Sequence, residues 1–255
     1  MSRSVWLGVL LFTTATASAQ TEVLDKLKAG DEALARFDLS QATIAYRDAL
    51  NADATNYEAH WKLARALIDQ ATLESDFANQ KNLYREAQDL ARTAVQLNPN
   101  NSKGHTFLAI GVGKLALFYG GRTKVELSNE VKIEAEKAAG LNPNEDLAYH
   151  VLGVWNREMA ELNWMLKKFA EILYGRFPPA SIDDALKDLR KASELAPNVV
   201  AHPVELGITL ATARQWSEAK STLDHALAMT NSWVTDDYYK DLAKRKLEAV
   251  KTHRN

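Results

Sequence analysis

The tetrapeptide Leu97-Asn98-Pro99-Asn100 recurs as Leu141-Asn142-Pro143-Asn144 and, with one change, as Leu195-Ala196-Pro197-Asn198. A residue that precedes proline is disfavoured in the helical conformation, so a helix has to end at each of these sites. The asparagine beside the proline can accept hydrogen bonds from the free amides that open a following helix. The repeated motif therefore predicts a chain of helices separated by turns.

Small and aliphatic residues precede the turns at intervals of three and four positions, which places them on one face of each helix. The sets are Ala42, Tyr46, Ala49; Ala87, Ala91, Ala94; Ala135, Ala138; Ala185, Leu189, Ala192; and Ala219, Leu223, Ala226. Gly153 and Gly207 lie in the upstream stretches and predict close contact between paired helices. The pattern resembles the tetratricopeptide repeat, a helix–turn–helix unit of about 34 residues.

The fold class that follows is an all-α, right-handed solenoid of about five tetratricopeptide-like helix pairs, with elongated central helices and a C-terminal capping helix. We expect residues 20–255 to form a single domain. Its repeats are predicted at about 23–56, 57–101, 102–144, 145–198 and 199–233, with the cap at 235–251.

The central repeats are longer than the usual period, because Pro99 and Pro143 are 44 residues apart and Pro143 and Pro197 are 54 apart. The apolar positions keep a helical spacing through this region. The sequence thus predicts one long helix from Asp146 to about Tyr174 and a turn at 177–179. The next helix should be capped by Ser181, with Asp184 three residues on.

The first 19 residues have the pattern of a secretory signal peptide. Arg3 precedes an apolar run over residues 5–12, and Ala17-Ser18-Ala19 forms a small-x-small cleavage pattern before Gln20. Such a run is too short to serve as a membrane anchor. We expect a periplasmic or secreted protein, exported by a bacterial route, with no transmembrane anchor after cleavage.

Composition narrows the functional classes. The 255 residues include no cysteine, which excludes disulfides, thiolate metal sites and a cysteine nucleophile. With 31 Lys and Arg against 33 Asp and Glu, the net charge is -2, so the chain lacks the basic excess of a nucleic-acid binder. We expect no enzyme, no cofactor and no metal site.

Two patterns imitate catalytic motifs. Gly111-Val112-Gly113-Lys114 lacks the other residues of a phosphate-binding loop and lies inside a predicted helix. His60, His105 and His150 are evenly spaced, but they fall at comparable positions of successive repeats. We interpret both patterns as packing positions.

A more specific pattern extends from Tyr149 to Asn198. It comprises His150-x-Leu152-Gly153-x-Trp155, Leu162-x-Trp164, Lys168-x-x-x-x-Leu173-x-Gly175, Pro179-Ala180-Ser181, Asp183-Asp184-Ala185-Leu186 and Lys191-Ala192-x-Glu194-Leu195-x-Pro197. It resembles the regulator of microtubule dynamics family over about residues 85–230. Members carry a tetratricopeptide-like domain, and one mitochondrial member tethers membranes and binds phospholipid in the concave face. The resemblance implies a groove for a hydrophobic ligand here.

The inner face of a curved solenoid is formed by the first helix of each pair. The repeat resemblance implies which positions face it, and these form the candidate binding site: Trp61, Arg65, Asp69, Thr106, Ile110, Lys114, His150, Val154 and Arg157. Three of them, Arg65, Lys114 and Arg157, are cations that could contact an anion. We also consider that the elongated central helices fill this face.

The leading functional hypothesis is a non-enzymatic scaffold that recognises a protein or peptide through this groove. The alternative is a carrier of phospholipid or another hydrophobic ligand in the same groove. We expect no nucleic-acid partner.

Overall fold

The computed structural model describes residues 6–174 and 180–251, and these ranges contain twelve helices and no strand. The helices are α1 (Trp6–Ala35), α2 (Leu39–Ala52), α3 (Tyr57–Leu73), α4 (Phe77–Leu97), α5 (Ser102–Ala116), α6 (Gly121–Leu141), α7 (Asp146–Ala160), α8 (Trp164–Tyr174), α9 (Ile182–Leu195), α10 (Ala201–Thr212), α11 (Trp216–Ala228) and α12 (Asp236–Lys251). The predicted all-α solenoid is confirmed.

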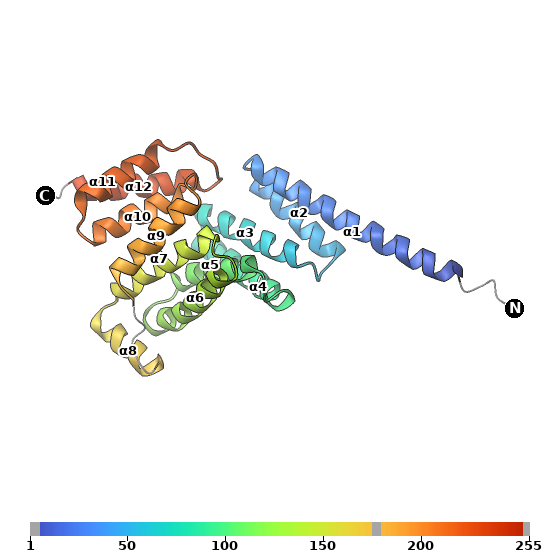
Figure 1. Cartoon of the computed structure of the whole chain (residues 1–255), viewed down its shortest axis with the longest axis horizontal. Helices are drawn as coiled ribbons and strands as arrows, with labels where there is room; N and C mark the ends of the chain where they lie inside the picture. Colours follow the sequence, from blue (N-terminus) through green and yellow to red (C-terminus); the bar gives the residue numbers. More distant parts are fainter. Residues whose placement is uncertain (1–5, 175–179, 252–255) are drawn as a thin grey trace.

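The helices pack as antiparallel pairs in chain order, each pair against the next. The pairs are α1 with α2, α3 with α4, α5 with α6, α7 with α9, and α10 with α11, and α12 packs on α10 and α11. Figure 1 shows this progression from blue to red, with the first pair extending away from the rest of the molecule. Residues 6–19 of the predicted signal region form the first part of α1, which continues beyond Ala19.

The small residues of the sequence pattern form the contacts between paired helices. Ala42, Ala87 and Ala135, one from each of the first three sets, have no exposed surface. Added at Gly153, a Cβ atom would lie 2.5 Å from Cγ of Leu189, so α7 and α9 are closer than any side chain at that position allows. Close packing at Gly153 is therefore confirmed.

The proline-marked turns end helices as predicted, but the asparagines act differently. Oδ1 of Asn98 accepts a hydrogen bond from the backbone N–H of Asn100, and Oδ1 of Asn142 accepts one from Asn144. Both asparagines therefore close a turn within the linker instead of capping the next helix. Capping of α5 falls to Asn101, which accepts a 3.1 Å hydrogen bond from the N–H of Lys103.

The prediction of one helix from Asp146 to about Tyr174 is wrong. The helix ends at Ala160, and α8 begins at Trp164 after a three-residue break. Oδ1 of Asn163 accepts a 3.0 Å hydrogen bond from the N–H of Leu166, so a helix start is encoded inside the apolar pattern. The predicted turn at 177–179 lies outside the described residues. Ser181 caps α9 as predicted, accepting from the N–H of Asp184.

Candidate binding cavity on the inner face

A cavity of about 570 Å³ lies on the inner face of the solenoid. Its walls come from α3, α5, α6, α7 and α10, and the linker before α12 and α12 itself close one side. The apolar part of the lining includes Ile68, Phe107, Ile110, Leu117, Val131, Leu147, Val151 and Trp155. Cavities of this size commonly hold a small molecule or a short segment of chain.

Seven of the nine residues selected from the sequence line this cavity. They are Arg65, Asp69, Ile110, Lys114, His150, Val154 and Arg157. The other two pack within the protein. The Trp61 ring is stacked on Phe107 with centroids 5.6 Å apart, and Thr106 is fully buried and donates to the carbonyl of Ser102.

A tryptophan outside the sequence-predicted set closes the cavity. Nε1 of Trp233 donates a 2.9 Å hydrogen bond to Asp69 on α3. The guanidinium carbon of Arg65 lies 3.9 Å from the centroid of the same ring. Trp233 belongs to the α11–α12 linker, and Figure 1 shows how far α3 lies from that linker along the chain. The groove is thus covered by the C-terminal end of the solenoid, not by elongated central helices.

The linker that carries Trp233 is held by its own hydrogen bonds. The carboxylate of Asp236, at the start of α12, accepts from the N–H groups of Ser232 and Trp233 at 2.7 and 2.8 Å. The hydroxyl of Ser232 donates to the carbonyl of Asn198. These contacts fix the direction in which the indole enters the cavity.

Two cations of the cavity wall have no acidic partner within ion-pair distance among the described residues. They are Arg65, which rests against aromatic rings, and Lys114, which makes no hydrogen bond or ion pair with residues 6–174 and 180–251. The charge of an ionised Tyr239 raises the pKa of Lys114, whereas burial of the ammonium group lowers it. An anion that enters the cavity would meet both groups.

Arg157, the third cation selected from the sequence, is already paired. Its Nη1 donates to Glu205 at 2.7 Å and to the hydroxyl of Thr209 at 3.1 Å, and its side chain is only 8% exposed. A buried pair of this kind links α7 to α10. Arg157 thus lines the cavity while its charge is neutralised by the protein.

The carboxyl group of Asp69 has a raised pKa because it is buried in the cavity wall. Burial raises its pKa to about 6, although Arg65 and the indole N–H of Trp233 act in the opposite direction. The carboxyl group therefore gains a proton close to neutral pH. Its protonation state is coupled to the residue that closes the cavity.

A relay of hydrogen bonds ends at His150. Nε2 of His202 lies 2.9 Å from Oδ2 of Asp146, and Nδ1 of His202 lies 3.0 Å from Nδ1 of His150. Burial would raise the pKa of Asp146, but the hydrogen bond and charge of His202 outweigh it and lower the pKa. Burial lowers the pKa of His150 well below its ordinary value, so this ring is neutral. When His202 is also neutral, it donates to Asp146 and accepts from His150.

The evenly spaced histidines do not meet. His60 contacts the carbonyl of Asn56, and His105 contacts Glu134 and the carbonyl of Pro99. Within residues 6–174 and 180–251, no group of three metal-ligating side chains converges. Gly111–Lys114 lies inside α5, where Gly111 packs on the backbone of Gln88, so these residues form no phosphate-binding loop.

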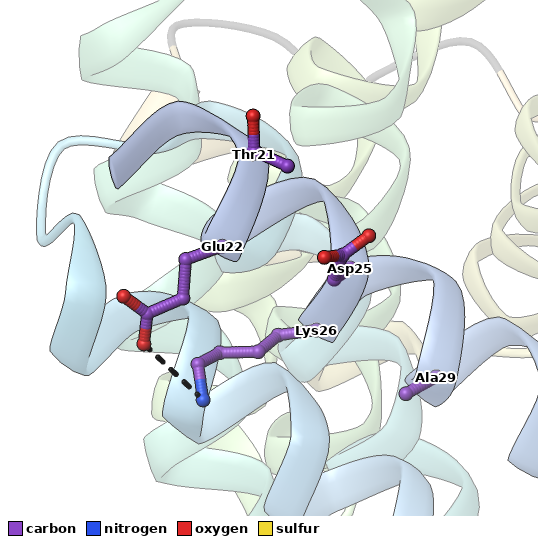
Figure 2. A pocket seen from close by; sticks show the side chains of 5 residues that line it. All are labelled: Thr21, Glu22, Asp25, Lys26 and Ala29. Atoms are coloured by element: carbon purple, nitrogen blue, oxygen red, sulfur yellow. Dashed lines mark ion pairs between the residues drawn. The ribbon is translucent and has the colours of Figure 1, made fainter. Parts of the chain in front are cut away.

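A second depression runs along one side of α1. Figure 2 shows its lining of Thr21, Glu22, Asp25, Lys26 and Ala29, all from this helix. Lys26 and Glu22 form an ion pair of 3.6 Å, one helical turn apart. Lined by a single solvated helix, this depression offers a ligand no second wall, and the inner cavity is the better candidate.

Comparisons with known proteins identify both the fold and the relatives. A family model described as Regulator of microtubule dynamics protein 1-3 matches residues 22–251. Regulator of microtubule dynamics protein 1 of Mus musculus is 29% identical over 203 residues, which are 75% of this chain and 65% of that protein. Protein 3 of Xenopus laevis is 32% identical over 137 residues, 54% of this chain and 30% of that protein. The chain thus spans less than two thirds of either relative.

Solved structures support the fold alone. A thermophilic TPR protein of Thermus thermophilus aligns with a TM-score of 0.64 at 17% identity, covering 91% of this chain and all of that one. The pilF protein of Pseudomonas aeruginosa aligns with a TM-score of 0.52 at 13% identity, covering 93% and 95% of the two chains. No helix in the described part of the chain is long and apolar enough to cross a bilayer.

Proposed function

This chain belongs to the regulator of microtubule dynamics family, and we propose that it is an exported, non-enzymatic scaffold whose inner cavity holds an acidic segment of a partner protein or peptide. The tetratricopeptide-like fold itself is typical of protein-interaction scaffolds. The relatives' names refer to microtubule dynamics. Our proposal for this chain is based on its cavity.

The state of two cavity cations, Arg65 and Lys114, is the observation that supports this proposal best. Among the described residues, both cations line the cavity without an acidic group at ion-pair distance, and Asp69 acts on them only through longer-range charge. The other cations there, Lys103, Lys124 and Arg157, pair with glutamates. A carboxylate from a peptide would supply the missing partner. Charge-assisted hydrogen bonds of this kind are stronger than neutral ones.

Fluorescence anisotropy tests the proposal with two labelled peptide pools, one with acidic side chains and a free C-terminus and one with the corresponding amides. We expect the free-carboxylate pool to bind and the Lys114→Gln variant to lose about tenfold in affinity, which is the usual scale of a hydrogen bond to a charged group. Lys187→Gln, on the exposed side of α9, is the matched control. Equal binding by wild type and Lys114→Gln would contradict the proposal.

A second candidate, a phospholipid or other anionic amphiphile in the same cavity, is favoured by the apolar lining and by the cover formed by Trp233, Tyr238 and Tyr239. Native mass spectrometry of protein purified from its host distinguishes the two. A co-purifying lipid mass that disappears in Lys114→Gln would support the carrier. Protein free of lipid that binds the carboxylate peptides would support the scaffold.

Export is tested separately by fractionation and intact mass. Expressed in a Gram-negative host, the full chain should be recovered from the periplasm with a mass that begins at Gln20. A Leu10→Arg substitution in the apolar run should retain it in the cytoplasm. Recovery of an uncleaved wild-type chain from the cytoplasm would contradict export.

A further inference from the structure

We propose that the outward face of α8, together with the α5–α6 turn, docks on an anionic lipid bilayer. This proposal concerns the outside of the molecule, although Leu117 and Lys124 also border the inner cavity. Figure 1 shows α8 (yellow) at the lower edge of the molecule, projecting beyond the paired helices.

The outward face of α8 is apolar. Trp164 is 74% exposed, Met165 63% and Ile172 82%. At the 100° per residue of an α-helix, these positions and Lys168 fall within an arc of about 100°. Ala170 on another side of the helix is fully buried. A surface helix of a soluble domain normally turns its polar face to water. In α8, by contrast, the face that is exposed to water is mainly apolar.

A second group of exposed apolar side chains lies at the α5–α6 turn and at the start of α4. Leu117, at the end of α5, is 62% exposed and also borders the inner cavity. Phe77, 66% exposed, contacts the Phe118 ring with centroids 4.6 Å apart. The start of α6 joins this group to α8, because the guanidinium carbon of Arg122 lies 4.8 Å from the centroid of the Phe169 ring.

The charges on this edge favour an anionic surface. Residues 117–124 and 164–172 contain the cations Arg122, Lys124, Lys167 and Lys168. Lys124 pairs with Glu158 and Lys168 with Glu171, whereas Lys167 donates to the carbonyl of Ala160. Aromatic and aliphatic side chains mixed with lysine and arginine are the composition of helices that lie in the bilayer interface. Anionic headgroups would attract the exposed side chains of Arg122 and Lys168.

The position of Lys168 favours a bilayer over a protein partner. On the helical wheel it lies between Trp164 and Ile172, in the centre of the apolar stripe. Lysine is depleted from the centres of protein interfaces, where its ammonium group would lose water. In a bilayer its long side chain can reach the headgroups while the neighbouring apolar groups enter the acyl region.

Vesicle flotation tests the proposal with phosphatidylcholine vesicles that contain about one third phosphatidylglycerol. We expect wild type to float and the double variant Trp164→Ser, Ile172→Ser to lose binding about tenfold or more, because its apolar contacts are removed. The matched control is Leu24→Ser with Ile44→Ser, which removes exposed apolar groups from α1 and α2. Circular dichroism should show equal melting temperatures for wild type and the α8 variant.

Three outcomes would overturn the proposal. They are no flotation of wild type, equal loss in the α1–α2 control, and equal flotation on pure phosphatidylcholine. If wild type does not float, a host protein partner that the α8 variant loses would show that this face binds protein instead. Lys114→Gln should float like wild type, so failure of the cavity proposal leaves this result unchanged.

Discussion

The indole N–H of Trp233 donates a 2.9 Å hydrogen bond to the carboxylate of Asp69, which precedes it by 164 positions. This bond joins the linker before the last helix to the first helix of the second pair. It closes a curved array, in which each pair otherwise contacts mainly its neighbours, into a ring around the inner cavity. Stability and access to the cavity are therefore coupled through these two residues.

Two substitutions of Trp233 distinguish the contribution of its hydrogen bond to Asp69 from that of its ring contact with Arg65. Trp233→Phe keeps an aromatic ring but leaves Asp69 without its donor, so we expect a loss of about 1–3 kcal/mol in the free energy of unfolding. Trp233→Leu also removes the cation–π contact and should be less stable still. Urea denaturation measures both, and equal stability of all three proteins would show that the closure contributes nothing.

Asp69 should make stability fall as the pH rises from about 4 to about 6. Its pKa in the folded state is about 6, above its ordinary value, so the folded protein holds this proton where the unfolded chain has lost it. Folding therefore takes up a proton in this window, and the contribution is largest at low pH and absent above it. Asp69→Asn keeps an acceptor for the indole and should flatten this part of the curve.

The difference in unfolding free energy between Asp69→Asn and wild type, measured from pH 4 to pH 7, isolates this group. Burial also raises the pKa of Asp188 to about 6. Asp188 is present in both proteins, so its contribution cancels in this difference. A difference that stays constant with pH would mean that Asp69 does not titrate in this range.

Gly153 and Gly140 should respond oppositely to alanine. A Cβ at Gly153 would meet Cγ of Leu189 at 2.5 Å and the carbonyl oxygen of Ala185 at 3.0 Å, so α7 and α9 must separate. We expect Gly153→Ala to lose about 1–3 kcal/mol. Gly140, inside α6, has no atom within 4 Å of such a Cβ, and Gly140→Ala should gain about 1 kcal/mol. Thermal denaturation compares the two, and a stable Gly153→Ala would contradict the close contact.

Replacing either member of the Arg157–Glu205 ion pair should strongly lower the free energy of unfolding. Their side chains are 8% and 13% exposed, so either single neutral substitution leaves a charge in a dry place. We expect Arg157→Met and Glu205→Leu each to lose about 3–5 kcal/mol, and the double variant to recover most of it. A double-mutant cycle by urea denaturation measures the coupling, and additive losses would show that the pair acts independently.

Local patterns predicted the paired helices well because their causes are local. A proline restricts the residue before it, and alanines three and four positions apart face the same way in any helix. The same reasoning failed for residues 146–174, where apolar spacing continues through a break. There the short-range hydrogen bond of Asn163 decided the outcome, and periodicity alone does not register it.

Seven of the nine inner-face residues line the cavity because their positions repeat with the helix register. Trp61 and Thr106 fit the same register, yet Trp61 stacks on the Phe107 ring and Thr106 donates to the backbone carbonyl of Ser102. Trp233 could not be selected in this way, since it belongs to a linker that has no repeat position. Its one sequence signal is the acidic residue three positions later, Asp236, which marks the start of a helix but gives no direction to the indole.

The sequence by itself determined where helices end and which faces pair, because backbone restriction and small side chains act within a few residues. Only the tertiary structure decided which inner cations are available. Arg157 meets Glu205 from another repeat, whereas Lys114 meets no carboxylate at bonding distance among the described residues. The tertiary structure also decided that Trp233 reaches Asp69 and that the apolar face of α8 points outward. These are relationships between distant segments, and they depend on the curvature accumulated over the whole stack of helices.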